Sequence, residues 1–111
     1  MSANAETFGR VEHANQADFA RHVLQSEVPV LVDFYADWCG PCQMLAPVLD
    51  ALAQETTQAK IVKVNVDQNP QLAVQYGVSS IPSLIVFQSG QVTSQHVGLA
   101  SKGQLKDMLG L

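Results

Sequence analysis

Apolar residues gather in five short runs along the chain, and these runs are rich in β-branched residues. Runs of about four to eight such residues, bounded by turn-forming residues, are typical of buried β-strands. Between the runs, apolar residues recur at the spacing of one helix face. The predicted strands span Gly9–Glu12, which is the weakest signal, Val28–Tyr35, Lys60–Val66, Ser83–Phe87 and Val92–Val97.

Four helices are predicted, one after each of the first three strands and one after the last. In the longest, over residues 44–53, Pro47 predicts a kink, because proline removes a helical hydrogen bond. The apolar face of this helix consists of Met44, Leu45, Val48, Leu49 and Leu52.

Residues that start and stop helices support these assignments. Asn15 and Asn69 are predicted N-caps, because a short side-chain oxygen accepts hydrogen bonds from the unpaired N–H groups of a first turn. Gly77 is predicted to end the third helix. Ser101 and Gln104 have the spacing of a capping box at the start of the last helix.

The order of these elements predicts an α/β fold in one domain. Alternating strands and helices place helices on both faces of a central sheet, and Ser89-Gly90 predicts a hairpin between the last two strands. The prediction is a five-stranded mixed sheet flanked by four helices. A chain of 111 residues, 47% of them hydrophobic, has room for one core and not for two. Residues 1–8 are predicted to form a flexible tail and residues 9–111 the domain.

Charge and hydropathy argue against two classes of partner. The formal net charge of −4 disfavours a nucleic-acid surface, and the apolar runs are far shorter than the ~20 residues that span a membrane. The N-terminal residues lack the charged and apolar regions of a secretory signal. If Met1 is the native start, we expect a reducing, cytoplasmic compartment; a mature form trimmed from a longer precursor stays open.

Both cysteines of the chain lie in the pentapeptide Trp38-Cys39-Gly40-Pro41-Cys42, between a predicted strand and a predicted helix. Unpaired N–H groups and the helix dipole favour negative charge at a helix N-terminus. A free thiol titrates near pH ~8.5, so a lowered pKa turns Cys39 into a usable nucleophile. Cys42 lies about one helical turn further on, within reach of a disulfide. The spacing therefore indicates a reversible dithiol/disulfide site.

Other interpretations of the cysteine pair are weaker. A structural zinc usually needs four nitrogen or sulfur ligands, whereas His13, His22 and His96 are scattered without ligand spacing, so no metal site is predicted. A purely structural disulfide would close a very short loop, which constrains the unfolded chain least. The local signature of papain-like proteases is absent.

Asp33 interrupts an otherwise apolar predicted strand, where a charge is costly. It shares one strand face with Leu31 and Tyr35. Burial is expected to raise the pKa of its carboxyl group, which makes Asp33 a candidate proton acceptor near neutral pH. The alternative is a buried, hydrogen-bonded aspartate with a structural role only.

Several separated segments, taken together, resemble the thioredoxin family from roughly Phe8 to the C-terminus. Tyr35 stands where many members carry a tryptophan, and Gln43 stands where a lysine is common. The matching segments are residues 32–42 with the cysteine pair, Pro47 at the helix kink, Asn65 to Pro70, Ile81-Pro82-Ser83, Val97-Gly98 and Ser101 to Leu105.

The resemblance implies a protein-disulfide reductase with a thioredoxin fold and no cofactor beyond its own cysteines. Cys39 is expected to attack a substrate disulfide, and Cys42 to resolve the mixed disulfide. Asp33 is expected to accept the Cys42 proton through water. Lys63, which interrupts another apolar strand, is expected to approach and tune Asp33; an exposed strand lysine is the alternative.

The resemblance also implies a substrate surface and partners. A cis Ile81-Pro82 bond is expected beside the cysteines, with the Ile81 backbone pairing with an extended substrate; an ordinary strand-start proline is the alternative. The expected partners are disulfide-containing proteins and a thioredoxin reductase that is linked to NADPH or ferredoxin. The protein itself is expected to be a monomer. Two alternative functions remain, an oxidant or isomerase of disulfides and a non-redox assembly subunit. Gly-Pro between the cysteines favours a reductant over an oxidant or isomerase. The expected contact patch consists of Trp38, Gly40, Pro41, Ile81 and Gly98.

Overall fold

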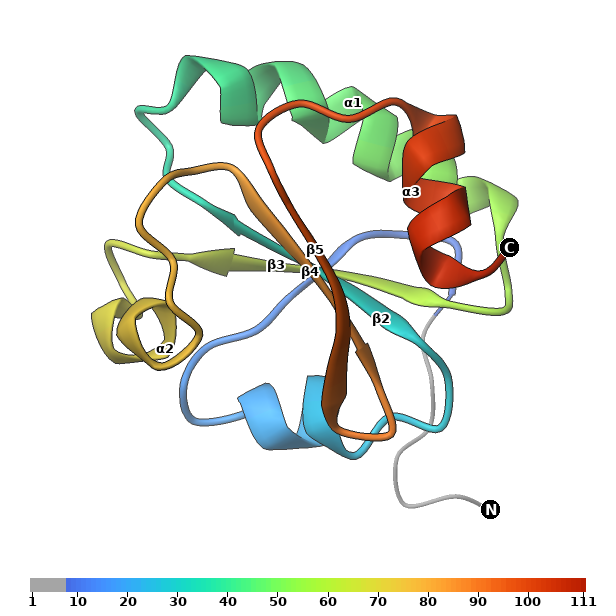
Figure 1. Ribbon diagram of the computed structural model, residues 1–111, viewed down its shortest axis with the longest axis horizontal. Helices are drawn as coiled ribbons and strands as arrows, with labels where there is room; N and C mark the ends of the chain where they lie inside the picture. The colour runs from blue at the N-terminus through green and yellow to red at the C-terminus, as the bar shows by residue number, and fades with distance from the viewer. Residues whose placement is uncertain (1–7) are drawn as a thin grey trace.

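The computed structural model describes residues 8–111, whose five strands form one mixed sheet in the order β1-β3-β2-β4-β5 (Figure 1). β1, β3 and β2 run parallel, whereas β4 is antiparallel to both β2 and β5. β2 therefore lies at the centre of the sheet, with hydrogen-bonded strands on both sides. The strands are β1 (Glu12–His13), β2 (Val30–Tyr35), β3 (Lys60–Asn65), β4 (Ser83–Gln88) and β5 (Gln91–Val97).

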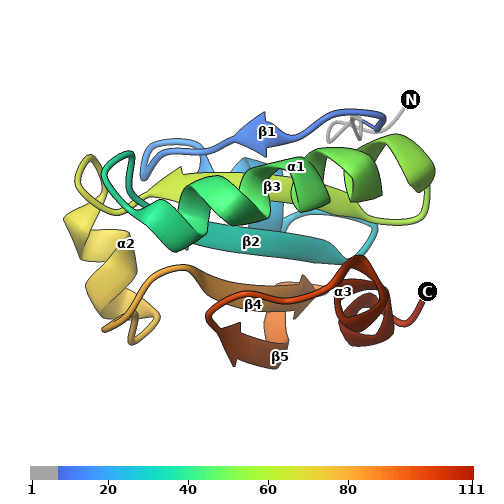
Figure 2. The same cartoon turned by 90° about the horizontal axis from the view of Figure 1, so that it is seen from above.

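Helices cover both faces of this sheet. Figure 1 shows α1 and α3 above the sheet and η1 below it, and Figure 2 shows α1 and α3 lying in front of the strands. The element order and the predicted α/β architecture are confirmed. The helices are η1 (Ala20–Leu24), α1 (Gly40–Glu55), α2 (Pro70–Gln75) and α3 (Lys102–Leu109).

Alternating side chains of β2 divide the hydrophobic core in two. Leu31 packs toward α1 and α3, in a cluster with Leu49 and Leu105. Val32 and Phe34 pack on the opposite face, in a cluster that includes residues of η1 and α2. Full burial of each such side chain contributes roughly 1.5–3 kcal/mol. A residue on the Leu31 face of β2 is consequently covered by α1.

Three local predictions were wrong. The first strand begins at Glu12, three residues later than predicted, because only Glu12 and His13 pair with β3. The first helix is a short π-helix, Ala20–Leu24, and not an α-helix beginning near Asn15. Met44 is 65% exposed, although it was placed on the apolar face of α1.

Asn15 and Asn69 do not cap their own helices. Asn69 stands at the N-cap position of α2, but its side-chain oxygen accepts a hydrogen bond from the Gln16 backbone N–H at 2.8 Å. Its amide nitrogen donates to the Asn15 side-chain oxygen at 3.2 Å. The two asparagines therefore join the segment before η1 to the start of α2, a long-range contact that outweighs capping.

Other helix and turn signals are confirmed. Ser101 and Gln104 form both hydrogen bonds of the capping box. Gly77 follows α2 with φ of +68°, and Ser89 and Gly90 both have positive φ at the hairpin turn. α1 continues past Pro47 to Glu55, and the kink at Pro47 stays a prediction.

Two further predictions concern the N-terminal tail and membrane-spanning segments. Residues 1–7 of the predicted tail lie outside the described residues, so the boundary at residue 9 stays a prediction. Within residues 8–111, no helix has the length and apolar character needed to cross a membrane.

Candidate active site

Cys39 and Cys42 form a disulfide at the N-terminal end of α1. Cys39 is the N-cap residue, and its Sγ accepts a hydrogen bond from the Cys42 backbone N–H at 3.2 Å. Cys42 lies one turn inside the helix and is buried. When the disulfide is reduced, negative charge on the Cys39 sulfur lies where the helix dipole and this N–H group stabilise it. The geometry therefore distinguishes Cys39 as the better thiolate.

Trp38 is the exposed neighbour of the pair. It is 71% exposed, and its indole N–H donates to Asp67 Oδ2 at 2.8 Å. Asp67 lies two residues past the end of β3, beside the end of the parallel strand β2, and accepts this bond there. Its role was not predicted, although an acidic residue just past a strand that neighbours β2 was an available signal. The bond fixes the orientation of a large ring beside the cysteines.

The predicted cis bond between Ile81 and Pro82 is present. The Ile81 carbonyl oxygen lies 3.8 Å from Cys39 Sγ. On the other side, the Gly98 backbone N–H donates to the Pro82 carbonyl at 2.8 Å. Three segments distant in sequence, at Cys39, Ile81 and Gly98, thus meet at one place. Their role in binding a substrate stays a prediction.

Further apolar residues lie next to those that the sequence predicted for a contact patch. Ala36 and Val66 pack against the two cysteines and were not predicted. Val97 and Leu99, on either side of Gly98, are 61% and 49% exposed. Exposed apolar side chains that gather beside a reactive pair are typical of an interaction surface.

Asp33 lies on the face of β2 that α1 covers, between Leu31, which packs beneath α1, and Tyr35, which packs against the cysteines. It is completely buried, and neither carboxylate oxygen has a hydrogen-bond partner among residues 8–111. This burial raises its pKa from 3.8 to about 7, although the nearby positive charge of Lys63 opposes the rise. A carboxyl group that titrates near neutral pH exchanges protons readily at physiological pH.

Lys63 is the register partner of Asp33 on the neighbouring strand β3. Its ammonium nitrogen does not hydrogen-bond to Asp33 but lies 4.2 Å from the centroid of the Tyr35 ring. The side chain is half-buried, so Lys63 is not merely an exposed strand lysine.

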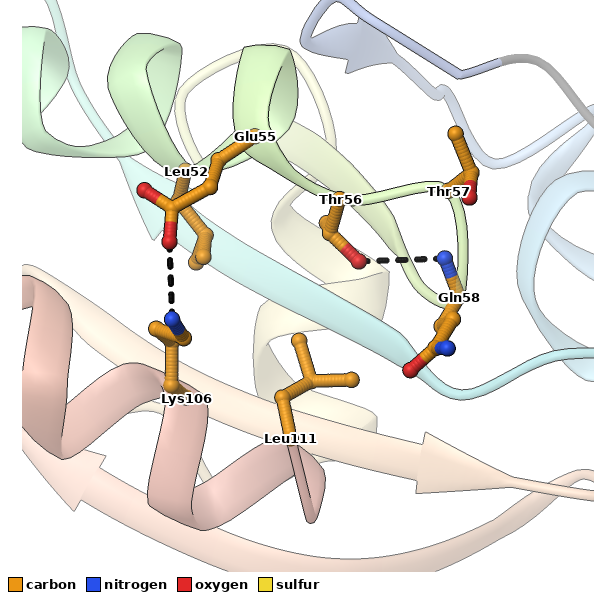
Figure 3. Close-up of a pocket in the computed structure, with 7 residues that line it drawn as sticks. All are labelled: Leu52, Glu55, Thr56, Thr57, Gln58, Lys106 and Leu111. Carbon is orange, nitrogen blue, oxygen red and sulfur yellow. Dashed lines mark hydrogen bonds and ion pairs between the residues drawn. The ribbon is translucent and has the colours of Figure 1, made fainter.

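A cavity lies between the C-terminal end of α1 and α3, at the far end of α1 from the cysteines (Figure 3). There Glu55 accepts from Lys102 at 2.6 Å and from Lys106 at 2.7 Å, and these hydrogen bonds lower the Glu55 pKa to about 2. The cavity contains none of the predicted site residues. Glu55 therefore joins two helices, and the chemistry lies at the other end.

Across residues 8–111, no cluster of three or more His, Cys, Asp or Glu side chains has the arrangement of a metal site. The two sulfurs lie among apolar residues at the start of α1, and the buried Asp33 carboxyl lies two residues before Tyr35, which packs against them. This arrangement supports thiol–disulfide exchange with a protein substrate.

Comparison with known proteins agrees with this chemistry. The family described as Thioredoxin matches residues 10–110. Thioredoxin 1 of Synechococcus elongatus is 52% identical over 94 residues, which cover 84% of this chain and 88% of that protein. Thioredoxin of Haemophilus influenzae is 50% identical over 100 residues, covering 89% and 94%. A mutant thioredoxin from Halobacterium salinarum has a similar structure, with a TM-score of 0.85, 39% identity and coverage of 95% and 93%.

Proposed function

The chain belongs to the thioredoxin family, and we propose that Cys39 is its attacking thiol and Cys42 its resolving thiol. Thioredoxins are thiol–disulfide oxidoreductases that reduce disulfides of other proteins with their own cysteine pair. The assignment rests on the hydrogen bond that the Cys42 backbone N–H donates to Cys39 Sγ at the N-cap of α1. It favours negative charge on Cys39 at the helix N-terminus, whereas Cys42 lies one turn inside the helix; both residues are buried.

The reaction transfers two electrons from this chain to its substrate. The Cys39 thiolate attacks one sulfur of the substrate disulfide, forms a mixed disulfide and displaces the other substrate sulfur as a thiolate. The Cys42 thiolate then attacks Cys39 Sγ and breaks the mixed disulfide. The second substrate thiolate leaves, both substrate thiolates take up protons from water, and the Cys39–Cys42 disulfide remains.

Asp33 accepts the Cys42 proton before the second attack. Its support is a buried carboxyl group on the face of β2 that α1 covers, whose two oxygens have no hydrogen-bond partner among residues 8–111. With a pKa of about 7, the carboxylate form is populated at neutral pH and still binds a proton. Lys63 tunes this equilibrium, because a positive charge favours the carboxylate.

The substrate docks on the patch around the cysteines. Trp38, Gly40 and Pro41 are exposed, whereas Ile81 and Gly98 are half-buried and contribute backbone groups. An extended substrate segment pairs with the backbone at Ile81, and apolar side chains of the patch exclude water from the reacting sulfurs.

A role as a reductant also indicates the compartment and the electron donor of the protein. A dithiol reductant stays reduced in a reducing compartment, so we place the protein in the cytoplasm. A thioredoxin reductase, linked to NADPH or ferredoxin, returns electrons to Cys39–Cys42, and the protein carries them to its substrates as a monomer. Residues 9–111 form the domain that does so.

The reduction potential tests the reductant assignment. Equilibration with mixtures of reduced and oxidised glutathione, followed by alkylation of free thiols, gives the potential of the Cys39–Cys42 couple. We expect a value in the range of about −270 mV, far below the about −120 mV of a strong disulfide donor. A value near −120 mV, as in a strong oxidant, would contradict the assignment and favour a disulfide donor.

A further inference from the structure

Ionisable and polar side chains form a row across the sheet face covered by α1. In the strand register, His13 of β1 faces Lys63 of β3, and Lys63 faces Asp33 of β2. Tyr35 lies two residues beyond Asp33 on the same face of β2. The row runs from the exposed His13 to the fully buried Asp33.

The contacts within this row place the Lys63 ammonium over the Tyr35 ring. Lys63 Nζ lies 4.2 Å from the ring centroid, a distance typical of a cation–π contact. The Tyr35 hydroxyl lies 3.5 Å from His13 Nδ1, and the two rings meet edge to face with centroids 6.2 Å apart. Within the described part of the chain, both Asp33 oxygens lack a hydrogen-bond partner. The ammonium is therefore held by a neutral ring although its register partner is a carboxyl group.

We propose that Tyr35 is a positioning residue whose ring holds the Lys63 ammonium short of a hydrogen bond to Asp33. This inference rests on the proposed role of Asp33 as the proton acceptor. An ammonium in direct contact with a carboxyl group favours the charged form strongly. With the ammonium held over the ring, Lys63 keeps a weaker influence, and Asp33 retains its proton up to a higher pH.

Other charged groups near the row come from several elements. His13 and Arg10 lie on and before β1, and Asp50 lies on α1; they line one cavity together with Lys63. Leu84, the β4 partner of Asp33, brings no charge. Among these groups only Lys63 shifts the Asp33 pKa against the effect of burial. Lys63 is thus the charge that opposes the rise in the Asp33 pKa, and the Tyr35 ring fixes the position of its ammonium.

The test measures the Asp33 pKa directly, by following the carboxyl ¹³C chemical shift of the oxidised protein across pH. In the disulfide form neither cysteine titrates, so the signal reports Asp33 without turnover. Tyr35→Leu removes the ring and is expected to lower the Asp33 pKa by about one pH unit, because an ammonium in contact lowers a carboxyl pKa by about 1–3 units. Tyr35→Phe keeps the ring and is the matched control, with a pKa near that of the unchanged chain.

The Lys63→Met background distinguishes two ways in which the Tyr35 ring could act on Asp33. The ring could position the Lys63 ammonium, or it could exclude water from Asp33 without involving Lys63. If Tyr35 acts through the ammonium, Tyr35→Leu changes the Asp33 pKa with Lys63 present and leaves it unchanged in the Lys63→Met background. An equal decrease in both backgrounds, or no decrease in either, overturns the proposal. Tyr35→Met serves as a second ring-free variant, judged by the same comparison, if Tyr35→Leu fails to fold.

The pH profile of disulfide reduction distinguishes this proposal from the proposed function. Both are supported if the profile of Tyr35→Leu moves to lower pH together with the Asp33 pKa. If the pKa moves while the profile stays fixed, Tyr35 positions Lys63 as proposed, but Asp33 does not accept the proton in the reaction.

Discussion

Asp33 and Lys63 are register partners on neighbouring parallel strands, yet the carboxyl group and the ammonium form no hydrogen bond. Burial dominates the behaviour of Asp33, since its pKa rises to about 7 despite the positive charge nearby. The molecule thus keeps a titratable group inside its core beside the helix that carries the cysteines. That arrangement is costly for the fold, and its cost depends on pH.

Asp33→Asn is expected to stabilise the fold increasingly as pH rises from about 4 to 7. Over this window the folded chain holds a proton that the unfolded chain, with a carboxyl pKa of 3.8, has already released. Rising pH therefore destabilises the unchanged protein until about pH 7, and the asparagine variant escapes this loss. Above pH 7, the free energy of unfolding of Asp33→Asn exceeds that of the unchanged protein by up to about 4 kcal/mol.

Urea unfolding of the oxidised protein at several pH values measures this difference. Asp50→Asn, at an exposed position of α1, is the matched control for replacing a carboxyl group by an amide outside the core. A stability gain for Asp33→Asn that is the same at pH 4.5 and pH 8 (assay conditions) would show that Asp33 does not titrate differently in the folded state.

Asp33→Asn is also expected to slow resolution of the mixed disulfide and leave the first attack unchanged. An amide cannot take the Cys42 proton, and general acid–base assistance is typically worth about 10²–10⁴-fold. Stopped-flow mixing with a chromogenic disulfide separates the two steps. Equal rates of release for both proteins across neutral pH would remove Asp33 from the mechanism.

The bond between Trp38 and Asp67 is expected to order the substrate surface. Asp67→Ala removes the acceptor of the indole N–H, so the ring loses its fixed orientation. We expect a weakening of substrate binding on the order of 1 kcal/mol, seen in KM more than in kcat. Because Trp38 is the only tryptophan, its fluorescence anisotropy reports the loss directly. Unchanged anisotropy and KM would contradict this role.

Gly98→Ala is expected to destabilise the fold by about 1 kcal/mol and raise KM. Gly98 has φ of +95°, which an L side chain rarely adopts, and its N–H bonds to Pro82 beside Cys39. Gly103→Ala is the matched control, because Gly103 lies in α3 with room for a Cβ. Alanine there is expected to stabilise the helix by roughly 0.5–1 kcal/mol. Thermal melts and KM values of both variants check the contrast.

Sequence reasoning predicted the features that depend on local chemistry. The element order, the capping box at Ser101 and the cysteine pair at a helix start follow from periodicity, caps and spacing. The charged residue within the apolar strand at Asp33 signalled burial, and its raised pKa agrees. These patterns act within a few residues, so a single sequence carries them.

Features that depend on distant contacts could not be predicted in this way. Asn15 and Asn69 look like caps but bond to each other across the fold. The position of the Lys63 ammonium over Tyr35 depends on strand register and on neighbouring side chains. The hydrogen bond from Trp38 to Asp67 likewise joins two loops that only the sheet brings together. Tertiary geometry decides each of these.

Trapping of the mixed disulfide tests the central assignment most directly. The reduced Cys42→Ser and Cys39→Ser variants are each mixed with a protein disulfide substrate, quenched by acid and analysed by intact mass. We expect Cys42→Ser to accumulate a covalent adduct through Cys39, because attack is retained and resolution is lost, whereas Cys39→Ser forms none at neutral pH. An adduct that forms faster through Cys42 than through Cys39 would show that the two roles are assigned the wrong way round.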